Sequence, residues 1–151
     1  MNPLSFVYPL MALIAGALFP MQASLNAQLG RGIGGPIAAT MISFAVGLAS
    51  MVLVNLVVFR QFPDFAEIAG QPLHLLLVGG ALGAAYVSIN VFLAPRIGAA
   101  VLLCFVIAGQ LVGALAIDRL GLFGLVVREL SIGRLAGVAL VLVGALMVRL
   151  A

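Results

Sequence analysis

Five uncharged polar side chains lie within strongly apolar stretches of this sequence and could bind a small molecule through hydrogen bonds. They are Gln22, Asn26, Tyr86, Asn90 and Gln110. Gln22 and Asn26 are four residues apart, as are Tyr86 and Asn90, so each pair shares one face of a helix. Polar groups in apolar surroundings are costly unless they are hydrogen-bonded. We therefore predict that these side chains line a substrate site; hydrogen bonds between neighbouring helices are the alternative.

Asp118 is the acidic residue closest to an apolar stretch, and Arg119 follows it. A carboxylate that is removed from water takes up a proton more readily than an exposed one. Asp118 is therefore a candidate for proton coupling. The alternative, which we favour, is a local ion pair with Arg119 or a hydrogen bond in the loop.

The sequence holds few residues that could catalyse a reaction. It has one histidine, one cysteine and four acidic residues, and they form no nucleophile–base set and no metal-binding motif. The glycine-rich segment Gly30–Gly35 is not followed by the lysine of a phosphate-binding loop. We expect no enzymatic activity, no metal and no cofactor.

The composition is that of an integral membrane protein. Of the 151 residues, 65% are hydrophobic and only 7% are charged, whereas soluble domains average about 45–50% apolar and about 25% charged residues. The mean hydropathy is +1.34. These values exclude an ordinary soluble domain, a disordered chain and a nucleic-acid-binding protein, and they make the lipid bilayer the main partner.

Five apolar runs are long enough to cross a membrane, which takes about 20 residues of helix. They predict an all-α chain in which residues 1–151 form a single membrane domain. The segment 118–132 is too short to span and is predicted to lie at the membrane interface. The predicted spans are 4–28, 36–58, 72–93, 97–117 and 133–150.

Small residues recur at the four-residue spacing that lets membrane helices approach closely. The predicted helix-packing glycines are Gly79 and Gly83, Gly109 and Gly113, and Gly133 and Gly137.

The arginines barely orient the five spans. Arg60, Arg119, Arg128 and Arg134 fall on one side, and Arg31, Arg96 and Arg149 fall on the other. Because positive charge near the span ends sets orientation, this balance favours dual topology. Secondary transporters are often built from two inverted repeats. We therefore expect the five-helix chain to pair with an inverted copy as an antiparallel homodimer.

Several ordered motifs resemble one known family over essentially the whole chain. The sequence resembles the YdcZ-type family of the drug/metabolite transporter superfamily, although it lacks the tryptophan that relatives often carry after the second span. The motifs are Gln22 and Asn26 before Leu29-Gly30-Arg31, Ser43-Phe44-x-x-Gly47, Tyr86-Val87, Pro95-Arg96-Ile97-Gly98, Gly109-Gln110-Leu111 and Asp118-x-x-Gly121-Leu122.

The resemblance implies one half of an inverted-repeat transporter, with five helices per chain, in the bacterial inner (cytoplasmic) membrane. It also implies pairing with an inverted copy, which is the same chain, a five-helix paralogue or a fused second half.

We therefore predict a transporter subunit that works by alternating access as an antiparallel dimer. Related small multidrug-resistance proteins carry a carboxylate in the first helix, where this chain has only amides. A small neutral or zwitterionic metabolite is therefore the expected substrate. The alternative is a structural or assembly subunit of a membrane complex that transports nothing itself.

Overall fold

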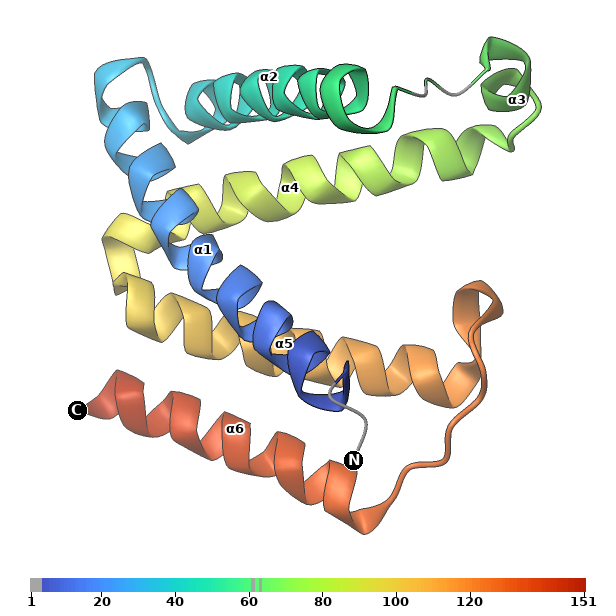
Figure 1. Ribbon diagram of the computed structural model, residues 1–151. Coiled ribbons are helices and arrows are strands. Elements are labelled where there is room, and N and C mark those ends of the chain that lie inside the picture. The colour runs from blue at the N-terminus through green and yellow to red at the C-terminus, as the bar shows by residue number, and fades with distance from the viewer. Residues whose placement is uncertain (1–3, 61, 63) are drawn as a thin grey trace. The chain divides into compact units, whose positions relative to one another are not determined.

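Five long apolar helices make up most of the chain in the computed structural model (Figure 1), which describes residues 4–60, 62 and 64–151, without the side chains of 4–6 and 124. Each is long and apolar enough to cross a membrane. The prediction of an all-α membrane protein with five spans is confirmed. The long helices are α1 (Leu4–Gly32), α2 (Pro36–Val54), α4 (Leu73–Ile97), α5 (Ala99–Leu120) and α6 (Ile132–Leu150).

Three short elements connect the long helices. A π-helical turn, η1 (Asn55–Phe59), continues α2, and a 3-10 turn, η2 (Leu122–Gly124), follows α5. The short helix α3 (Phe65–Ala69) lies in the polar connection between α2 and α4, where the sequence predicts no helix. The Oδ1 atom of Asp64 accepts a hydrogen bond from the Ala66 amide at 3.2 Å and thereby caps α3.

Two spans end four residues later than predicted. Helix α1 ends at Gly32 instead of residue 28, and α4 ends at Ile97 instead of residue 93. The predicted spans leave a break around Pro95, but α4 continues through it to Ile97 although proline lacks the N–H that would bond the Val91 carbonyl. The break comes at Gly98, whose φ of 80° suits glycine.

The chain forms two compact units, Met1–Arg96 and Ile97–Ala151. Unit 1 contains α1, α2, α3 and α4, and unit 2 contains α5 and α6. One membrane domain over residues 1–151 stays a prediction.

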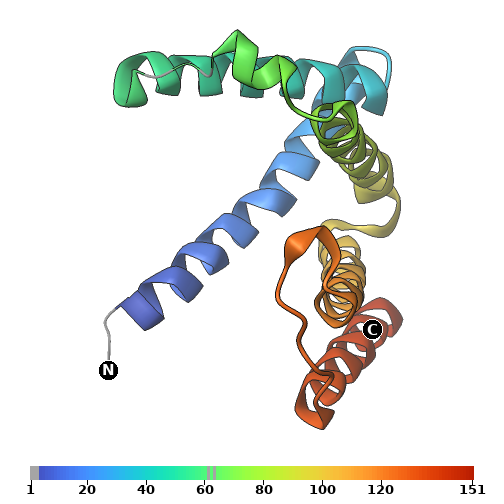
Figure 2. The ribbon, with the colours of Figure 1, turned by 90° about the vertical axis from the view of Figure 1, so that its right-hand side faces the viewer.

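The core of unit 1 lies where the end of α1, the start of α2 and the end of α4 converge (Figures 1 and 2). Ala23 and Gly30 of α1, Ala39 of α2, and Val91 and Ala94 of α4 are buried there. Four of these five residues are alanine or glycine, and small side chains let helix backbones approach closely.

A glycine turn joins α1 to α2 within this core. Gly34 and Gly35 have φ values of 95° and 117°, which residues other than glycine rarely adopt. The Gly35 amide donates a hydrogen bond to the Gly30 carbonyl at 2.8 Å. Pro36 then begins α2, where its missing N–H is no loss.

In unit 2, α5 packs against α6, and the extended segment 125–131 returns along the end of α5. The Arg128 amide donates to the Asp118 carbonyl at 2.9 Å. The Ser131 hydroxyl accepts a hydrogen bond from the Arg134 amide at 3.3 Å and caps α6. No span lies between Asp118 and Ile132, in agreement with the predicted interfacial segment.

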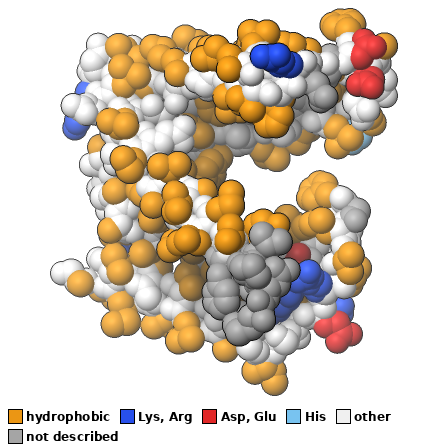
Figure 3. Space-filling view, viewed as in Figure 1, with side chains coloured by type: hydrophobic (Ala, Val, Ile, Leu, Met, Phe, Trp, Pro, Cys, Tyr) orange, Lys and Arg blue, Asp and Glu red, His pale blue; other side chains and the backbone are white. Residues whose placement is uncertain are grey.

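Hydrophobic side chains are spread over the visible face, with charged groups at a few places among them (Figure 3), and many large apolar side chains are exposed. Exposed apolar patches of this extent mark a membrane or interaction surface. The bilayer therefore covers much of the surface that the helices leave open.

Candidate functional site

Each of the three long helices of unit 1 contributes one buried polar side chain. Asn26 on α1 is 7% exposed, Thr40 on α2 is 4% exposed and Asn90 on α4 is 3% exposed. We call these three residues, the buried polar side chains in the described part of unit 1, the polar cluster. Buried polar groups normally have hydrogen-bond partners. Any atom of this cluster that lacks a partner is therefore available to bind a ligand.

Two amide atoms of the polar cluster have no hydrogen-bond partner within the described part of the chain. The Thr40 hydroxyl donates to the Pro36 carbonyl at 2.9 Å, and the Asn90 Nδ2 atom donates to the Tyr86 carbonyl at 2.7 Å. The Asn26 Nδ2 atom and the Asn90 Oδ1 atom are left unpaired. Leaving a buried donor or acceptor unpaired costs about 1–3 kcal/mol each. The cluster thus retains one donor and one acceptor.

Tyr86 lies one turn before Asn90 on α4 and packs against α1. Its ring centroid is 5.4 Å from that of Phe19, with 34° between the ring planes. Aromatic pairs at this separation attract each other beyond the area they bury. The contact joins α1 to α4 beside the polar cluster.

The two predicted glutamines lie outside the cluster. On α1, Phe19, Ala23, Asn26 and Gly30 form one stripe toward the core, and Gln22 lies beside this stripe and is exposed. The four-residue spacing places Gln22 near Asn26, but the packed face of α1 is too narrow to bury both. Gln110 is exposed on α5 in unit 2.

The structure thus places Asn26, Tyr86 and Asn90 in unit 1, and their role in a substrate site stays a prediction. It also adds Thr40, which the sequence analysis missed. The sequence feature that could have identified Thr40 is a hydroxyl residue one turn after Pro36 in an otherwise apolar span.

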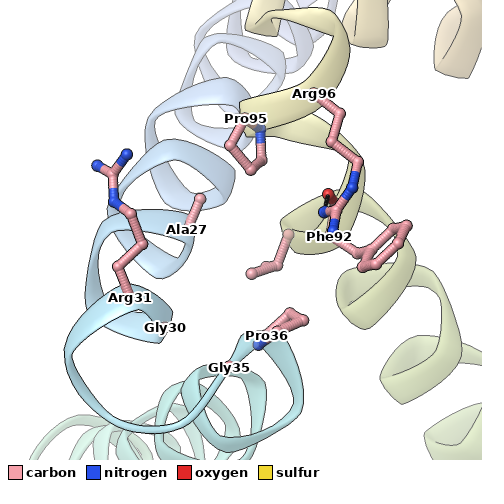
Figure 4. A pocket seen from close by; sticks show the side chains of 9 residues that line it. Ala27, Gly30, Arg31, Gly35, Pro36, Phe92, Pro95 and Arg96 are labelled. Carbon is pink, nitrogen blue, oxygen red and sulfur yellow. Dashed lines mark hydrogen bonds between the residues drawn. The ribbon is translucent and has the colours of Figure 1, made fainter.

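A cavity of about 450 Å³ lies at the convergent end of unit 1 (Figure 4). We call it the turn cavity, because the glycine turn forms one of its walls. Its lining includes Ala27, Gly30, Gly35, Pro36, Phe92 and Arg96.

Arg96 is held against the wall of the turn cavity. Its guanidinium carbon lies 3.4 Å from the centroid of the Phe92 ring, a cation–π contact. Its Nη1 atom donates to the Phe92 carbonyl. Arg31 also lines the cavity, but its guanidinium points away from it in Figure 4. The sequence analysis assigned neither arginine to a site.

Asp118 forms an ion pair in unit 2, and its partner is Arg134 rather than the neighbouring Arg119. The Arg134 Nη1 atom lies 3.4 Å from Asp118 Oδ2, and each side chain is about one-third exposed, at 34% and 33%. Both residues line a cavity of about 420 Å³ between α5 and α6. Arg134 lies sixteen residues after Asp118 and reaches it because α5 packs against α6. The neighbour of Asp118 in the sequence is therefore not its partner in the structure.

The predicted packing glycines differ in their surroundings. A Cβ atom built on Gly83 would lie 3.8 Å from Cζ of Phe44 on α2, so Gly83 faces a neighbouring helix. Near Gly133 only Ser131 comes within 4 Å. Nothing comes within 4 Å of such an atom at the other four positions, which are Gly79, Gly109, Gly113 and Gly137.

No three His, Cys, Asp or Glu side chains come together in a way that could hold a metal ion, as far as the described residues go. The charged groups near α1, α2 and α4 at the cavity end are arginines. What unit 1 offers at this end is therefore hydrogen bonding, an aromatic wall and positive charge.

Residues 7–147 match the family model described as "Putative inner membrane exporter, YdcZ". The match covers nearly the whole chain and agrees with the five apolar helices. The chain belongs to the YdcZ family. No curated protein and no solved structure gives a significant match.

Membership of the YdcZ family confirms the resemblance drawn from the motifs. It makes the chain a membrane transport protein. The bilayer around it is an inner membrane, by the description of the family.

Proposed function

We propose that the chain is one subunit of an antiparallel dimer that moves a small neutral or zwitterionic metabolite across the bacterial inner membrane by alternating access. The partner is a second copy or a five-helix paralogue. In this proposal Asn26, Tyr86 and Asn90 bind the substrate in unit 1. Gln22 and Gln110 complete the site in the assembled dimer.

The proposal rests mainly on the unpaired amide atoms of the polar cluster. Asn26 Nδ2 and Asn90 Oδ1 are buried without a partner. Both residues lie within helices long enough to span the membrane, where an unpaired polar group marks a functional site more often than in a soluble core. A donor and an acceptor together suit a substrate that carries both kinds of group.

The chemistry of the cluster favours an uncharged or charge-balanced substrate. Asn26, Thr40, Tyr86 and Asn90 offer amides, a hydroxyl and a phenol ring but no carboxylate or cationic group. A cation or an anion entering this environment would lose its hydration without gaining a counter-charge. Exchange of protons for cationic drugs on an acid in α1 is therefore not expected.

The position of Gln22 supports a second subunit. Gln22 is exposed and lies ten residues before the end of α1 at Gly32, which is about 15 Å along the helix. That depth falls well inside a hydrocarbon core of about 30 Å. An amide facing lipid there is costly, whereas a partner chain would provide hydrogen bonds or a water-filled cavity.

Substitution of the two asparagines tests the proposal. Candidate compounds are first selected by their effect on the melting temperature of the purified protein and are then used in transport assays with proteoliposomes. We expect Asn26→Ala and Asn90→Ala to lower the transport rate by about tenfold, because each removes a hydrogen bond to the substrate.

Asn55→Ala is the matched control. Asn55 lies at the end of α2, and its Nδ2 atom donates to the Met51 carbonyl of its own helix at 3.1 Å. We expect it to leave transport unchanged. If Asn26→Ala and Asn90→Ala fold normally and transport at the wild-type rate, the assigned site is wrong. Obligate copurification with an unrelated membrane protein, without transport of any compound, would favour the structural subunit instead.

A further inference from the structure

The turn cavity differs from the proposed substrate site in carrying positive charge. The polar cluster is uncharged, whereas the cavity carries the guanidinium groups of Arg31 and Arg96. The cavity also lies at the ends of α1 and α4 and the start of α2. Because these three helices are long enough to span a bilayer, their ends lie at the level of the lipid headgroups.

No carboxylate of unit 1 lies near the turn cavity. The acidic residues of this unit are Asp64 and Glu67, in and beside α3. They lie close in sequence to Leu73 at the start of α4, whereas the cavity lies near its other end, at Arg96, about 35 Å of helix away. This distance exceeds the Debye length of about 8 Å at physiological salt. Within the described part of unit 1, the two arginines therefore have no counter-ion nearby.

Arg96 is already positioned to bind an anion. The Phe92 ring lies on one face of its guanidinium group, and one nitrogen donates to the Phe92 carbonyl. A guanidinium group has five N–H donors in a fixed plane, so several remain for a ligand. Two parallel N–H donors of a guanidinium group match two oxygen atoms of a phosphate group. The contact with Phe92 holds the guanidinium group in place and so lowers the entropic cost of binding.

The apolar walls of the turn cavity fit a ligand with a hydrocarbon part. Ala27, Val91 and Pro95 contribute only apolar side chains to the lining. The first turn of α2 also borders the cavity at Gly35 and Pro36 and has no acidic residue or side-chain cap. Pro36 has no N–H and the Gly35 amide is bonded to the Gly30 carbonyl, so the preference for an anion comes from the arginines.

We propose that the turn cavity binds a phosphate group at the membrane surface, with Arg96 as the main ligand and Arg31 as a second that turns inward on binding. The phosphate belongs to the headgroup of an anionic phospholipid, and inorganic phosphate is the soluble source with the same chemistry. Basic pockets between membrane helices are suited to anionic headgroups. This inference is independent of the proposed transport activity.

Competition between two lipids tests the proposal. The full-length protein in detergent is exposed to equal amounts of phosphatidylglycerol and phosphatidylcholine, and the retained lipids are counted by native mass spectrometry. We expect the wild-type protein to retain phosphatidylglycerol preferentially. Arg96→Gln should reduce this preference about tenfold, because a charge-assisted hydrogen bond is lost. Arg96→Lys should restore only part of it, since lysine lacks the planar fork.

Arg149→Gln is the matched control, because it removes the same charge from the last turn of α6 in unit 2, outside the cavity. It should leave the preference unchanged. Arg31→Gln, at an exposed position, keeps the test valid if Arg96→Gln fails to fold, and it should cause a smaller loss. Equal losses in Arg96→Gln and Arg149→Gln would indicate general attraction to positive charge and would overturn the proposal.

A second arm distinguishes the source of the phosphate. Inorganic phosphate is added to delipidated protein, and the melting temperature is measured. Stabilisation that needs Arg96, without a preference for phosphatidylglycerol, would assign the site to soluble phosphate. Absence of both the lipid preference and the stabilisation by phosphate would overturn the proposal.

Discussion

Asp118 and Arg134 join α5 to α6 through an ion pair of 3.4 Å. Both side chains are about one-third exposed, and pairs that water can reach contribute about 0–1 kcal/mol to stability. The pair therefore helps to hold the two helices together without dominating their packing.

We expect Asp118→Asn to lower the melting temperature of the purified protein by about 2–4 °C at most. Arg134→Gln should have a similar effect. The double variant should cost less than the sum of the two, because both changes remove the same contact. Thermal unfolding in detergent measures all three. An unchanged melting temperature together with loss of the response to an imposed proton gradient would make Asp118 a proton-coupling residue instead.

At the scale of elements, the turn between α1 and α2 determines how closely the two helices meet. Gly30 is buried, and a Cβ atom at this position would lie 3.0 Å from the Gly35 carbonyl oxygen. That oxygen belongs to the backbone of a turn whose φ angle at Gly35 is 117°. The turn therefore has little freedom to move away.

We expect Gly30→Ala to destabilise the protein by about 1–3 kcal/mol, which is typical when a well-packed site is overfilled. Gly32→Ala is the matched control, because nothing lies within 4 Å of a Cβ atom there. It should be neutral or slightly stabilising, since alanine is the better helix former. The melting temperatures of the two purified variants measure this difference, and Gly30→Ala should have the lower one. Equal effects of both substitutions would contradict a specific role for Gly30.

At the scale of the whole molecule, large apolar surfaces need either lipid or a partner chain. Gly109 and Gly113 of α5 are exposed, and none of the described residues of another element comes within 4 Å of a Cβ atom built at either position. Pairs of small residues at this spacing form close helix contacts in membranes. They are therefore candidate contacts with the second subunit of the proposed dimer.

We expect Gly109→Leu and Gly113→Leu to shift the protein from dimer toward monomer while the fold of unit 2 is retained. Ala100→Leu is the matched control. Ala100 is exposed on the same helix and lies nine residues, or about two and a half turns, before Gly109, so it faces the opposite side. Size-exclusion chromatography with light scattering measures the oligomeric state. A dimer that persists in both glycine variants would place the interface elsewhere.

The sequence by itself determined that this is a membrane protein of five helices in the YdcZ family. Hydrophobicity and span length are local properties, and lipid requires each span to satisfy its own backbone hydrogen bonds, so a helix follows directly from an apolar run. The same locality explains why the ends of α1 and α4 were misplaced by four residues. A helix end depends on single backbone angles, such as that of Gly98.

Only the tertiary structure decided which polar groups are buried. Gln22 and Asn26 share a helix face in the sequence pattern, but only Asn26 lies in the stripe that α1 packs against its neighbours. Thr40 joins the polar cluster, and Asp118 pairs with Arg134, because helix crossings bring them into position. The turn cavity likewise combines residues from three helices. Burial, unlike helix formation, depends on where helices meet, and that information is not local.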